Sequence, residues 1–519
     1  MEVGSALNPD EFPGLAHFLE HMLFMGTEKF PNEEAYSQHC SNFSGYDNAY
    51  TGLEMTNYHF EVSNEGFDKA LDMFAQFFIG PLFSKDSVDR EMNAVDSENK
   101  KNLQSDMWRF FQILQNESEP TSALNRFSTG NLETLKKDGV VEALKDFHKK
   151  WYSANIMNLV VYSKKSCDEL ETMVKDLFSV VEDKQVTVPS FKEPECYPKE
   201  KLGQIHYIKP IMNKDTLKFH WFYECHQKDH YHKVLNIVSH VIGHEGENSL
   251  LSYLIAEDLA TELGSYADHE LSALSYFSCS ITLTPKGLKE YKRVIEIVCQ
   301  MTQNITKDGP KDHVYEECSK LGDLGWKFLE KSNAVGTATT LAARMNLFEE
   351  DNIKEINSTM YMFKEFNKEK YQDALNNLVP ENLNIYLSSQ SVDTMTDKEF
   401  IKEKWYGVEY AKEKFSSDLL ESMKNPKIED KEHAKLSNPL ENTLFPKNLD
   451  VLAADAEASK SVQKIYGDEK LDVWYKKSDK FKIPKVVVST FLLTNDCEYN
   501  LTVEGSLFVE MWLKGKFKL

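Results

Sequence analysis

No run of apolar residues in this sequence is long enough to span a bilayer. Hydrophobic residues make up 41% of the 519 residues and are interspersed with charged residues, which account for 28%. A membrane-spanning helix needs about 20 consecutive apolar residues. We therefore expect no membrane partner for this chain.

Basic residues are scarce relative to acidic ones. The chain has 60 Lys and Arg against 83 Asp and Glu, which gives a net charge of -23. Nucleic acids are bound chiefly by Lys and Arg side chains that neutralise phosphates. The balance disfavours nucleic acid as a partner and is typical of a soluble acidic protein.

Paired cysteines are also missing. Eight cysteines occur singly along the sequence, with no CxxC pair and no dense framework. Scattered single cysteines are typical of reduced thiols in a cytosolic protein. No segment of basic and then apolar residues precedes the first motif, so no secretion signal is expected. We expect a cytoplasmic protein.

The length and two polar stretches predict several domains. A chain of 519 residues is too long for one hydrophobic core. Residues 186–209 and 424–448 are rich in proline or charge and are typical of interdomain connections. The expected domains are residues 1–193, residues 194–440, and a linker with a truncated start of a third domain at 441–519.

Hydrophobic periodicity predicts a similar order of elements in the first two domains. Residues 51–62 alternate like a strand, and residues 67–78 have helical apolar spacing. Ser84 can cap a long helix that runs towards Trp108 and Phe111. We expect an α+β fold with two homologous domains, each an antiparallel sheet with segregated helices, plus the beginning of a third. Further strands are expected at 157–162, 217–223, 276–283 and within 474–491, and further helices near 168–178, 234–241, 250–259 and from 288.

The segment His17-Phe18-Leu19-Glu20-His21 carries a metal-binding pattern. Residues four apart share one face of a helix, so His17 and His21 can direct two imidazoles at one metal ion. A catalytic zinc site keeps one position for water, whose pKa the metal lowers to about 7. Glu20 can then act as the general base on that water. The flanking residues are apolar, and buried histidines need partners such as a metal.

A third ligand has to come from elsewhere in the chain. Glu91 and Glu98 are seven residues apart, two turns along one helical face, so either carboxylate can reach the metal. The alternative is a solvated helix face without metal. A second group, His226, His230 and His232, has similar spacing but lies in a polar stretch, where surface histidines are common.

Three stretches together resemble a known family. They are GLAHFLEHMLFMGTEKFP, SNFSGYDNAYTGLEMTNYHFEV and DREMNAVDSENKKN. They are similar to the inverzincin family of zinc metallopeptidases, in its insulysin branch, with nardilysin as nearest relative. The resemblance implies one zinc ion per chain, held by His17, His21 and Glu98. It also implies Glu20 as the base and Glu91 as the group that holds a ligand histidine in its metal-binding tautomer.

The resemblance further implies two places that bind the substrate. Asn48 and Ala49 would hydrogen-bond the peptide backbone or the scissile carbonyl, although Asn48 alone suggests only a turn. The stretches 243–247 and 263–268 would form an exosite that holds a peptide by strand addition. Residues 1–193 would be the zinc-binding catalytic domain and 194–440 a non-catalytic domain. The exosite residues are Gly243, His244, Gly246, Glu247, Leu263 and Gly264.

The sequence departs from the family in length. Members are about twice as long and open with strands well before the zinc helix, so the first strands of the first sheet are expected to be missing. The carboxyl-terminal half of the family is absent apart from its start, and residues 501–519 are either a diverged start of the third domain or an unrelated end. Expected partners are peptide substrates, with a carboxyl-terminal half or further copies of the chain as additional candidates.

Three functions remain open at this point. The leading hypothesis is a zinc metalloendopeptidase that hydrolyses small to medium peptides of the insulin, glucagon or amyloid type. The second is a truncated, weakly active or inactive half-protein that binds peptides. The third is a nardilysin-like peptidase for dibasic sites, which HFLEH favours and which the lack of a long acidic insertion opposes.

Overall fold

The computed structural model describes residues 1–226, 228–349, 351–429, 435–446, 448–451, 461–477 and 483–491. The chain divides into two compact units, Met1–Asn442 and Thr443–Leu519. The larger unit combines helices with one hairpin and one large sheet, and the α+β class is confirmed. Within the described residues, no helix is both long and apolar enough to cross a membrane.

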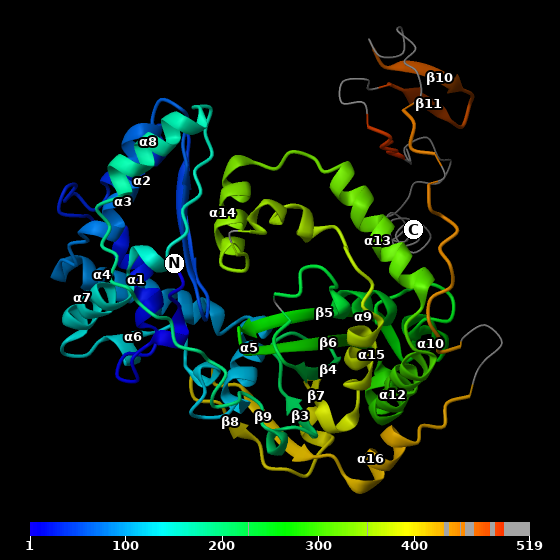
Figure 1. Ribbon diagram of the computed structural model, residues 1–519. Helices are drawn as coiled ribbons and strands as arrows, with labels where there is room; N and C mark the ends of the chain where they lie inside the picture. The colour runs from blue at the N-terminus through cyan, green and yellow to red at the C-terminus, as the bar shows by residue number, and fades with distance from the viewer. Residues whose placement is uncertain are drawn as a thin grey trace. The chain divides into compact units, whose positions relative to one another are not determined.

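The first part of the large unit packs helices against a two-stranded hairpin (Figure 1). Strands β1 and β2 pair in antiparallel register, with Asn48 opposite His59. The aromatic side chains of α3 and β2 form the centre of the core with α1 and α7. Its elements are α1 (Leu15–Leu23), α2 (Ala35–Asn42), β1 (Tyr46–Thr51), β2 (Thr56–Glu61), α3 (Phe67–Ile79), α4 (Lys85–Asn102), α5 (Asp106–Glu117), α6 (Leu132–Leu135), α7 (Val140–Trp151) and α8 (Cys167–Phe178).

The second part is built on a seven-stranded sheet with the order β5-β6-β4-β7-β3-β9-β8. All of its pairs are antiparallel except β3 with β7, which is parallel and was not predicted. Its strands are β3 (Gln204–Ile208), β4 (Thr216–Tyr223), β5 (Ala260–Leu271), β6 (Leu274–Leu283), β7 (Leu383–Ser388), β8 (Ile401–Lys402) and β9 (Glu409–Lys414). Its helices are α9 (Val234–Ile242), α10 (Leu250–Ala256), α11 (Pro285–Lys289), α12 (Tyr291–Asp308), α13 (Asp312–Lys327), α14 (Ala334–Met345), α15 (Lys368–Asn376) and α16 (Ser417–Lys424).

The two faces of this sheet pack against different parts of the chain. Alternate residues of β4, including Phe219 and Trp221, face α9 and α12 in the largest core. The opposite face meets α5, where the ring of Phe110 lies 5.0 Å from that of Tyr386 and 5.4 Å from that of His220. Helix α5 therefore joins the two parts of the large unit.

Several predicted boundaries are wrong. The long helix ends at Asn102, because Ser105 adopts an extended conformation before α5 turns onto the sheet. A turn at 52–55 divides the strand predicted at 51–62. Strand β3 lies inside the predicted linker 186–209. Residues 157–162 form no strand, since no neighbouring strand bonds to them within the described residues.

The second unit contains an antiparallel pair, β10 (Gln463–Gly467) with β11 (Asp472–Tyr475). Strands were predicted within 474–491; among the described residues of this range, the end of β11 is a strand, and 476–477 and 483–491 are not. Residues 501–519 lie outside the described residues. The division at 193 and 440 stays a prediction.

Candidate metal centre and chamber

Two helices bring three metal-ligating side chains together. His17 and His21 lie one turn apart on α1, with ring centroids 4.9 Å apart. Glu98 approaches from α4, and its Oε2 lies 3.5 Å from His17 Nε2 and 3.6 Å from His21 Nε2. The three ligand atoms lie within 4.8 Å of one another, and no second such cluster occurs among the described residues.

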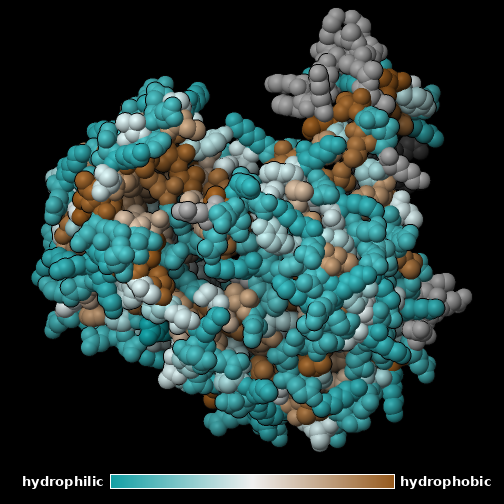
Figure 2. All heavy atoms as spheres, in the orientation of Figure 1, coloured by the Kyte–Doolittle hydropathy of each residue, from teal (hydrophilic) through white to brown (hydrophobic). Residues whose placement is uncertain are grey.

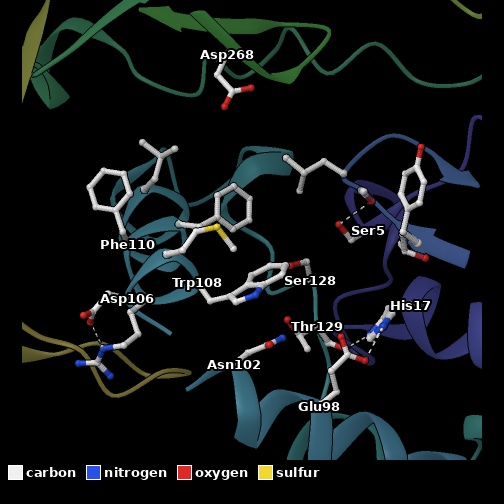
Figure 3. A pocket seen from close by; sticks show the side chains of 18 of the residues that line it. Ser5, His17, Glu98, Asn102, Asp106, Trp108, Phe110, Ser128, Thr129 and Asp268 are labelled. Atoms are coloured by element: carbon white, nitrogen blue, oxygen red, sulfur yellow. Dashed lines mark hydrogen bonds and ion pairs between the residues drawn. The ribbon is translucent and has the colours of Figure 1, made fainter. Parts of the chain in front are cut away.

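The far nitrogen of each imidazole is already hydrogen-bonded. His17 Nδ1 donates to the carbonyl oxygen of Thr129 at 2.7 Å, and His21 Nδ1 donates to Glu91 Oε2 at 3.1 Å. A ring whose Nδ1 carries the proton presents an unprotonated Nε2. Both Nε2 atoms are thereby available on the side of Glu98, which Figure 3 shows beside His17 and Thr129.

Two glycines set the position of α1, the helix that carries His17 and His21. Gly14 precedes α1 with φ of 90°, in the left-handed region. A Cβ on Gly14 would lie 2.2 Å from the Cα of Gly130, so the two backbones touch. This contact places Thr129, the residue before Gly130, next to His17. Sequence reasoning missed Thr129, because this residue acts through its backbone carbonyl.

The distances from Glu98 to the two imidazole nitrogens are close to those around a tetrahedral zinc ion. Zinc bonds of about 2.0–2.1 Å place neighbouring ligand atoms about 3.3 Å apart. The nitrogen-to-oxygen distances of 3.5 and 3.6 Å are close to that value. Two imidazoles and one carboxylate are a ligand set of catalytic zinc sites, which leave a fourth position open.

The site concentrates negative charge around the two rings. Burial lowers the pKa of His21, but hydrogen bonds to Glu91 and Glu98 and the charge of Glu20 outweigh it and raise the pKa to about 9. Hydrogen bonds from His17 and His21 hold the pKa of Glu98 far below its usual range. Three carboxylates so close together favour a positive charge among them.

Glu20 is buried, with 7% of its surface exposed. Its Oε2 accepts a hydrogen bond of 2.6 Å from Thr51 Oγ1, at the end of β1. Thr51 Oγ1 also lies 3.3 Å from Thr56 Oγ1, which donates to the carbonyl of Val3. The sequence did not indicate Thr51, since a hydroxyl distant along the chain has no spacing signal.

The three ligand residues and Glu20 line one wall of a cavity of about 1240 Å³. Asn48 and Ala49 line it from β1, beside this wall. Trp108 and Phe110 project from α5 between the His17–Glu98 pair and Asp268, as Figure 3 shows. The cavity is therefore bounded by the helices of the first part and by the large sheet.

The two predicted exosite stretches lie side by side. Ser239 Oγ donates to the carbonyl of Ser265, and Ser265 Oγ donates to that of Ser239, both at 2.8 Å. These bonds tie the end of α9, capped at Gly243, to β5. Strand β5 is the edge of the large sheet, and its Tyr266 and Asp268 line the cavity. Of the residues named for the exosite, Leu263 is partly buried against the core, and the space beside the Cα of Gly264 is free of neighbouring atoms. The ring of His244 lies close to Gly246, and Glu247 follows in the same loop.

The second histidine group does not converge on one point. The ring of His230 stacks on Phe348 at 4.2 Å, and its Nε2 bonds to the carbonyl of Leu347. His232 instead pairs with Asp229. These rings have ordinary structural partners.

Models of one peptidase family match nearly the whole chain. The insulinase model of peptidase family M16 matches residues 1–121, the M16 inactive domain matches 140–321, and the middle or third domain of peptidase M16 matches 326–515. The chain belongs to peptidase family M16, a family of metallopeptidases.

Individual relatives make the assignment more specific. The insulin-degrading enzyme of Drosophila melanogaster is 36% identical over 96% of this chain and 50% of its own length. Nardilysin of Rattus norvegicus is 33% identical over 95% of this chain and 42% of its own length. The predicted resemblance to the insulysin type is confirmed, and the chain spans about half the length of the curated relatives it matches.

The fold is also that of a known structure. The crystal structure of pitrilysin has a TM-score of 0.81 over 93% of this chain and 50% of its own, at 24% identity. This likeness concerns the fold alone.

Proposed function

We propose that this protein is a zinc metalloendopeptidase of the insulysin type, with one zinc ion held by His17, His21 and Glu98. The proposal is carried by the convergence of three ligand atoms whose imidazoles are oriented by Thr129 and Glu91. A zinc ion bound there would supply Lewis acidity for the hydrolysis of a peptide bond.

The residues of the chain would then handle the proton and the substrate. Glu20 takes a proton from the attacking water and passes it to the leaving amine. Thr51 holds the Glu20 carboxylate in place through its hydrogen bond. Asn48 and Ala49, on β1, bind the peptide backbone or the scissile carbonyl beside the site.

The substrates are small to medium peptides of the insulin, glucagon or amyloid type. The wall that carries His17, His21, Glu98 and Glu20 faces a partly open cavity of about 1240 Å³, a size that suits peptides better than large folded proteins. Among the described strands, β5 has a neighbour on one side only, so its other side is a place where a peptide can add as a strand, next to the loop at 243–247. We place the protein in the cytoplasm, because all seven cysteines among the described residues are free thiols.

Two alternatives keep specific support. The chain covers half of its relatives, which supports a peptide-binding half-protein that needs a carboxyl-terminal half or a further copy for turnover. Nardilysin is nearly as similar as insulin-degrading enzyme, which supports cleavage at dibasic sites.

The test measures zinc and cleavage on the same sample. We expect one zinc ion per chain and cleavage of a quenched insulin-like peptide, with the Glu20→Gln variant keeping the zinc and losing the cleavage. A His230→Ala variant serves as the histidine control and should change neither. Cleavage that persists in Glu20→Gln would disprove the mechanism.

Two further arms separate the alternatives. Adding a separately expressed carboxyl-terminal half of a relative tests whether turnover needs it. Zinc without cleavage by the chain alone favours the half-protein, and cleavage that appears only with the added half shows that turnover needs that half. A dibasic peptide cut faster than the insulin-like one favours the nardilysin type.

A further inference from the structure

Lys218 of β4 is a basic side chain in a cavity whose charged groups are mostly acidic. It lines the cavity of about 1240 Å³ from the side of the large sheet, and Lys214 and Arg109 are the other Lys and Arg side chains among the described residues of its lining. Six carboxylates line the same cavity, those of Glu20, Asp47, Glu91, Glu98, Asp106 and Asp268. A positive group in such surroundings can bind an anionic part of a ligand selectively.

The other two basic side chains of the cavity already have partners. Lys214 Nζ lies 3.1 Å from Glu262 Oε2. Arg109 donates to two backbone carbonyls and lies 3.7 Å from an oxygen of Asp106, whose two oxygens each accept a backbone N–H at 2.8 Å. Among the residues that the structure describes, no hydrogen bond or ion pair reaches the Lys218 ammonium.

The ring of Phe110 holds this ammonium in place. Lys218 Nζ lies 3.9 Å from the centre of the ring, which is a cation–π contact. The ring itself is fixed by edge-to-face contacts with His220 and Tyr386. Burial lowers the pKa of Lys218 to about 8, and the charge of Asp106 compensates only in part. A carboxylate beside this fixed and partly desolvated ammonium would supply the missing partner.

Two hydroxyl groups lie on the same face of the sheet as Lys218. Thr216 is two residues earlier in β4, so its side chain shares this face and its Cα lies about 7 Å from that of Lys218. Ser388 is directly opposite Thr216 in β7, and both residues line the cavity. Neither hydroxyl bonds to another of the described residues. Hydroxyls, like an ammonium, donate hydrogen bonds to carboxylates.

We propose that Lys218, with Thr216 and Ser388, binds a carboxylate of a peptide that occupies the cavity. The carboxylate belongs to a glutamate or aspartate side chain or to the free carboxyl end of the peptide. Figure 3 shows Phe110, on whose ring the ammonium lies, and His17 on opposite sides of Trp108. Lys218 therefore contacts a part of the peptide away from the metal centre.

The rest of the cavity wall opposes acidic side chains. Asp47 lines it from β1, and Asp268 lines it from β5. An acidic residue of the peptide is repelled beside these carboxylates and attracted at Lys218. The site thus favours an acidic residue at one position of the peptide and determines how the peptide lies. The inference rests on the proposed function only in taking a peptide as the ligand.

The binding test uses the Glu20→Gln variant, so that bound peptides stay intact. Figure 2 shows hydrophobic residues exposed over the first part of the chain, so the labelled peptides contain only alanine and glutamine besides the tested residue. Each peptide has about ten residues, which span about 30 Å when extended. Each ends in an amide and carries one glutamate, which moves by one position from peptide to peptide.

Fluorescence anisotropy should show a preference for glutamate at one position or at two neighbouring ones. There we expect binding about tenfold tighter than that of the peptide with glutamine in the same place, because a hydrogen bond to a charged group is formed. A glutamine peptide with a free carboxyl end tests the second source of a carboxylate. Acetylation of Lys218, followed by mass spectrometry, should slow when the preferred peptide is bound.

Variants of the protein locate the preference. Lys218→Met keeps the length of the side chain and its contact with Phe110 but removes the charge, so glutamate and glutamine peptides should bind equally. Lys218→Arg keeps the charge and should retain most of the preference. Lys214→Met removes the lysine that is paired with Glu262 and should leave the preference unchanged. Circular dichroism verifies that the three variants fold.

The outcomes separate this inference from the proposed function. Failure of every carboxylate-bearing peptide to bind, equal binding of glutamate, glutamine and free-carboxyl peptides, or a preference that survives in Lys218→Met would each overturn the inference. A preference that disappears in Lys218→Met supports it, even if the chain with Glu20 intact cuts no peptide. That last result would count against the proposed function alone.

Discussion

At the scale of single residues, two hydrogen bonds to carboxylates control the candidate site. Thr51 holds the proposed base, and Glu91 holds a proposed ligand. A hydrogen bond to a charged group contributes about 1.5–3 kcal/mol, which corresponds to tenfold or more in a rate or a binding constant. A substitution that preserves the size of the side chain can remove the first bond and weaken the second.

Replacement of Thr51 by valine should slow the chemical step without weakening substrate binding. Valine has the same shape but cannot donate to Glu20 Oε2, so the carboxylate is less well placed to accept a proton. We expect kcat to fall about tenfold, with KM and zinc content unchanged. Thr51→Ser restores the hydroxyl and should recover most of kcat, and a valine variant with full kcat would rule out this role.

Replacement of Glu91 by glutamine should weaken metal binding. The neutral amide is a poorer acceptor for His21 Nδ1, and such partners of metal ligands typically contribute 10–100-fold in affinity. We expect a loss of about that size when zinc is titrated against a competing chelator. Asp89→Asn removes an exposed acid from the same helix and should not change the zinc affinity.

At the scale of elements, the close approach of two glycines determines where α1 lies. A methyl group on Gly14 would collide with the backbone of Gly130, and φ of 90° is itself unfavourable for alanine. Moving α1 away from Gly130 would also separate His17 from the carbonyl of Thr129. Stability and metal binding are therefore coupled at this contact.

Gly14→Ala should lower both the free energy of unfolding and the zinc affinity. Gly139 is the matched control, because it precedes α7 with φ of 86° but a Cβ there meets nothing within 4 Å. Gly139→Ala should lower the free energy of unfolding by only about 1 kcal/mol, the penalty for placing alanine in the left-handed region. Urea denaturation should show a larger loss for Gly14→Ala, and equal losses would show that the contact with Gly130 is unimportant.

The sequence predicted helices better than strands for a physical reason. The apolar period of 67–78 and the Ser84 cap are local, and α3 and α4 begin where they were expected. A strand exists only if another strand lies beside it, and no described strand pairs with the apolar residues 157–162. The parallel pairing of β3 with β7 joins residues about 180 positions apart, which no local pattern encodes.

The residues of the candidate site also divide into those that local spacing predicts and those that depend on contacts between distant segments. His17, Glu20 and His21 follow from spacing on one helix, and the geometry brings Glu98 to them as the family resemblance implied. Thr51 and Thr129 were missed, since each acts through a contact between distant segments. The peptide-binding roles of Asn48, Ala49 and the loop at 243–247 stay predictions.

At the scale of the whole molecule, buried neutral histidines link stability to pH. Burial lowers the pKa of His206, within the large sheet, to about 4, and it also lowers that of His148, in α7, to about 4. Both ring nitrogens of His206 lack a hydrogen-bond partner, and its ring stacks on Tyr386. A charge on this ring in the folded state would therefore have no hydrogen-bonding compensation.

The free energy of unfolding should therefore decrease as the pH falls from 6.5 to 4. In this window the unfolded chain protonates these histidines, while the folded chain keeps them neutral, so protons favour unfolding. A shift from 6.5 to about 4 corresponds to up to about 3 kcal/mol for each group. His21 works in the other direction, but its pKa of about 9 confines its effect to pH values above 6.5.

Urea midpoints measured between pH 4 and pH 7 test this linkage. His206→Phe keeps the stacking on Tyr386 and removes the titrating group, so the pH dependence between 6.5 and 4 should become shallower. An unchanged pH dependence in His206→Phe would mean that His206 becomes protonated in the folded protein over the same pH range as in the unfolded chain. The packing of α5 against this face of the sheet would then have to accommodate a charged ring.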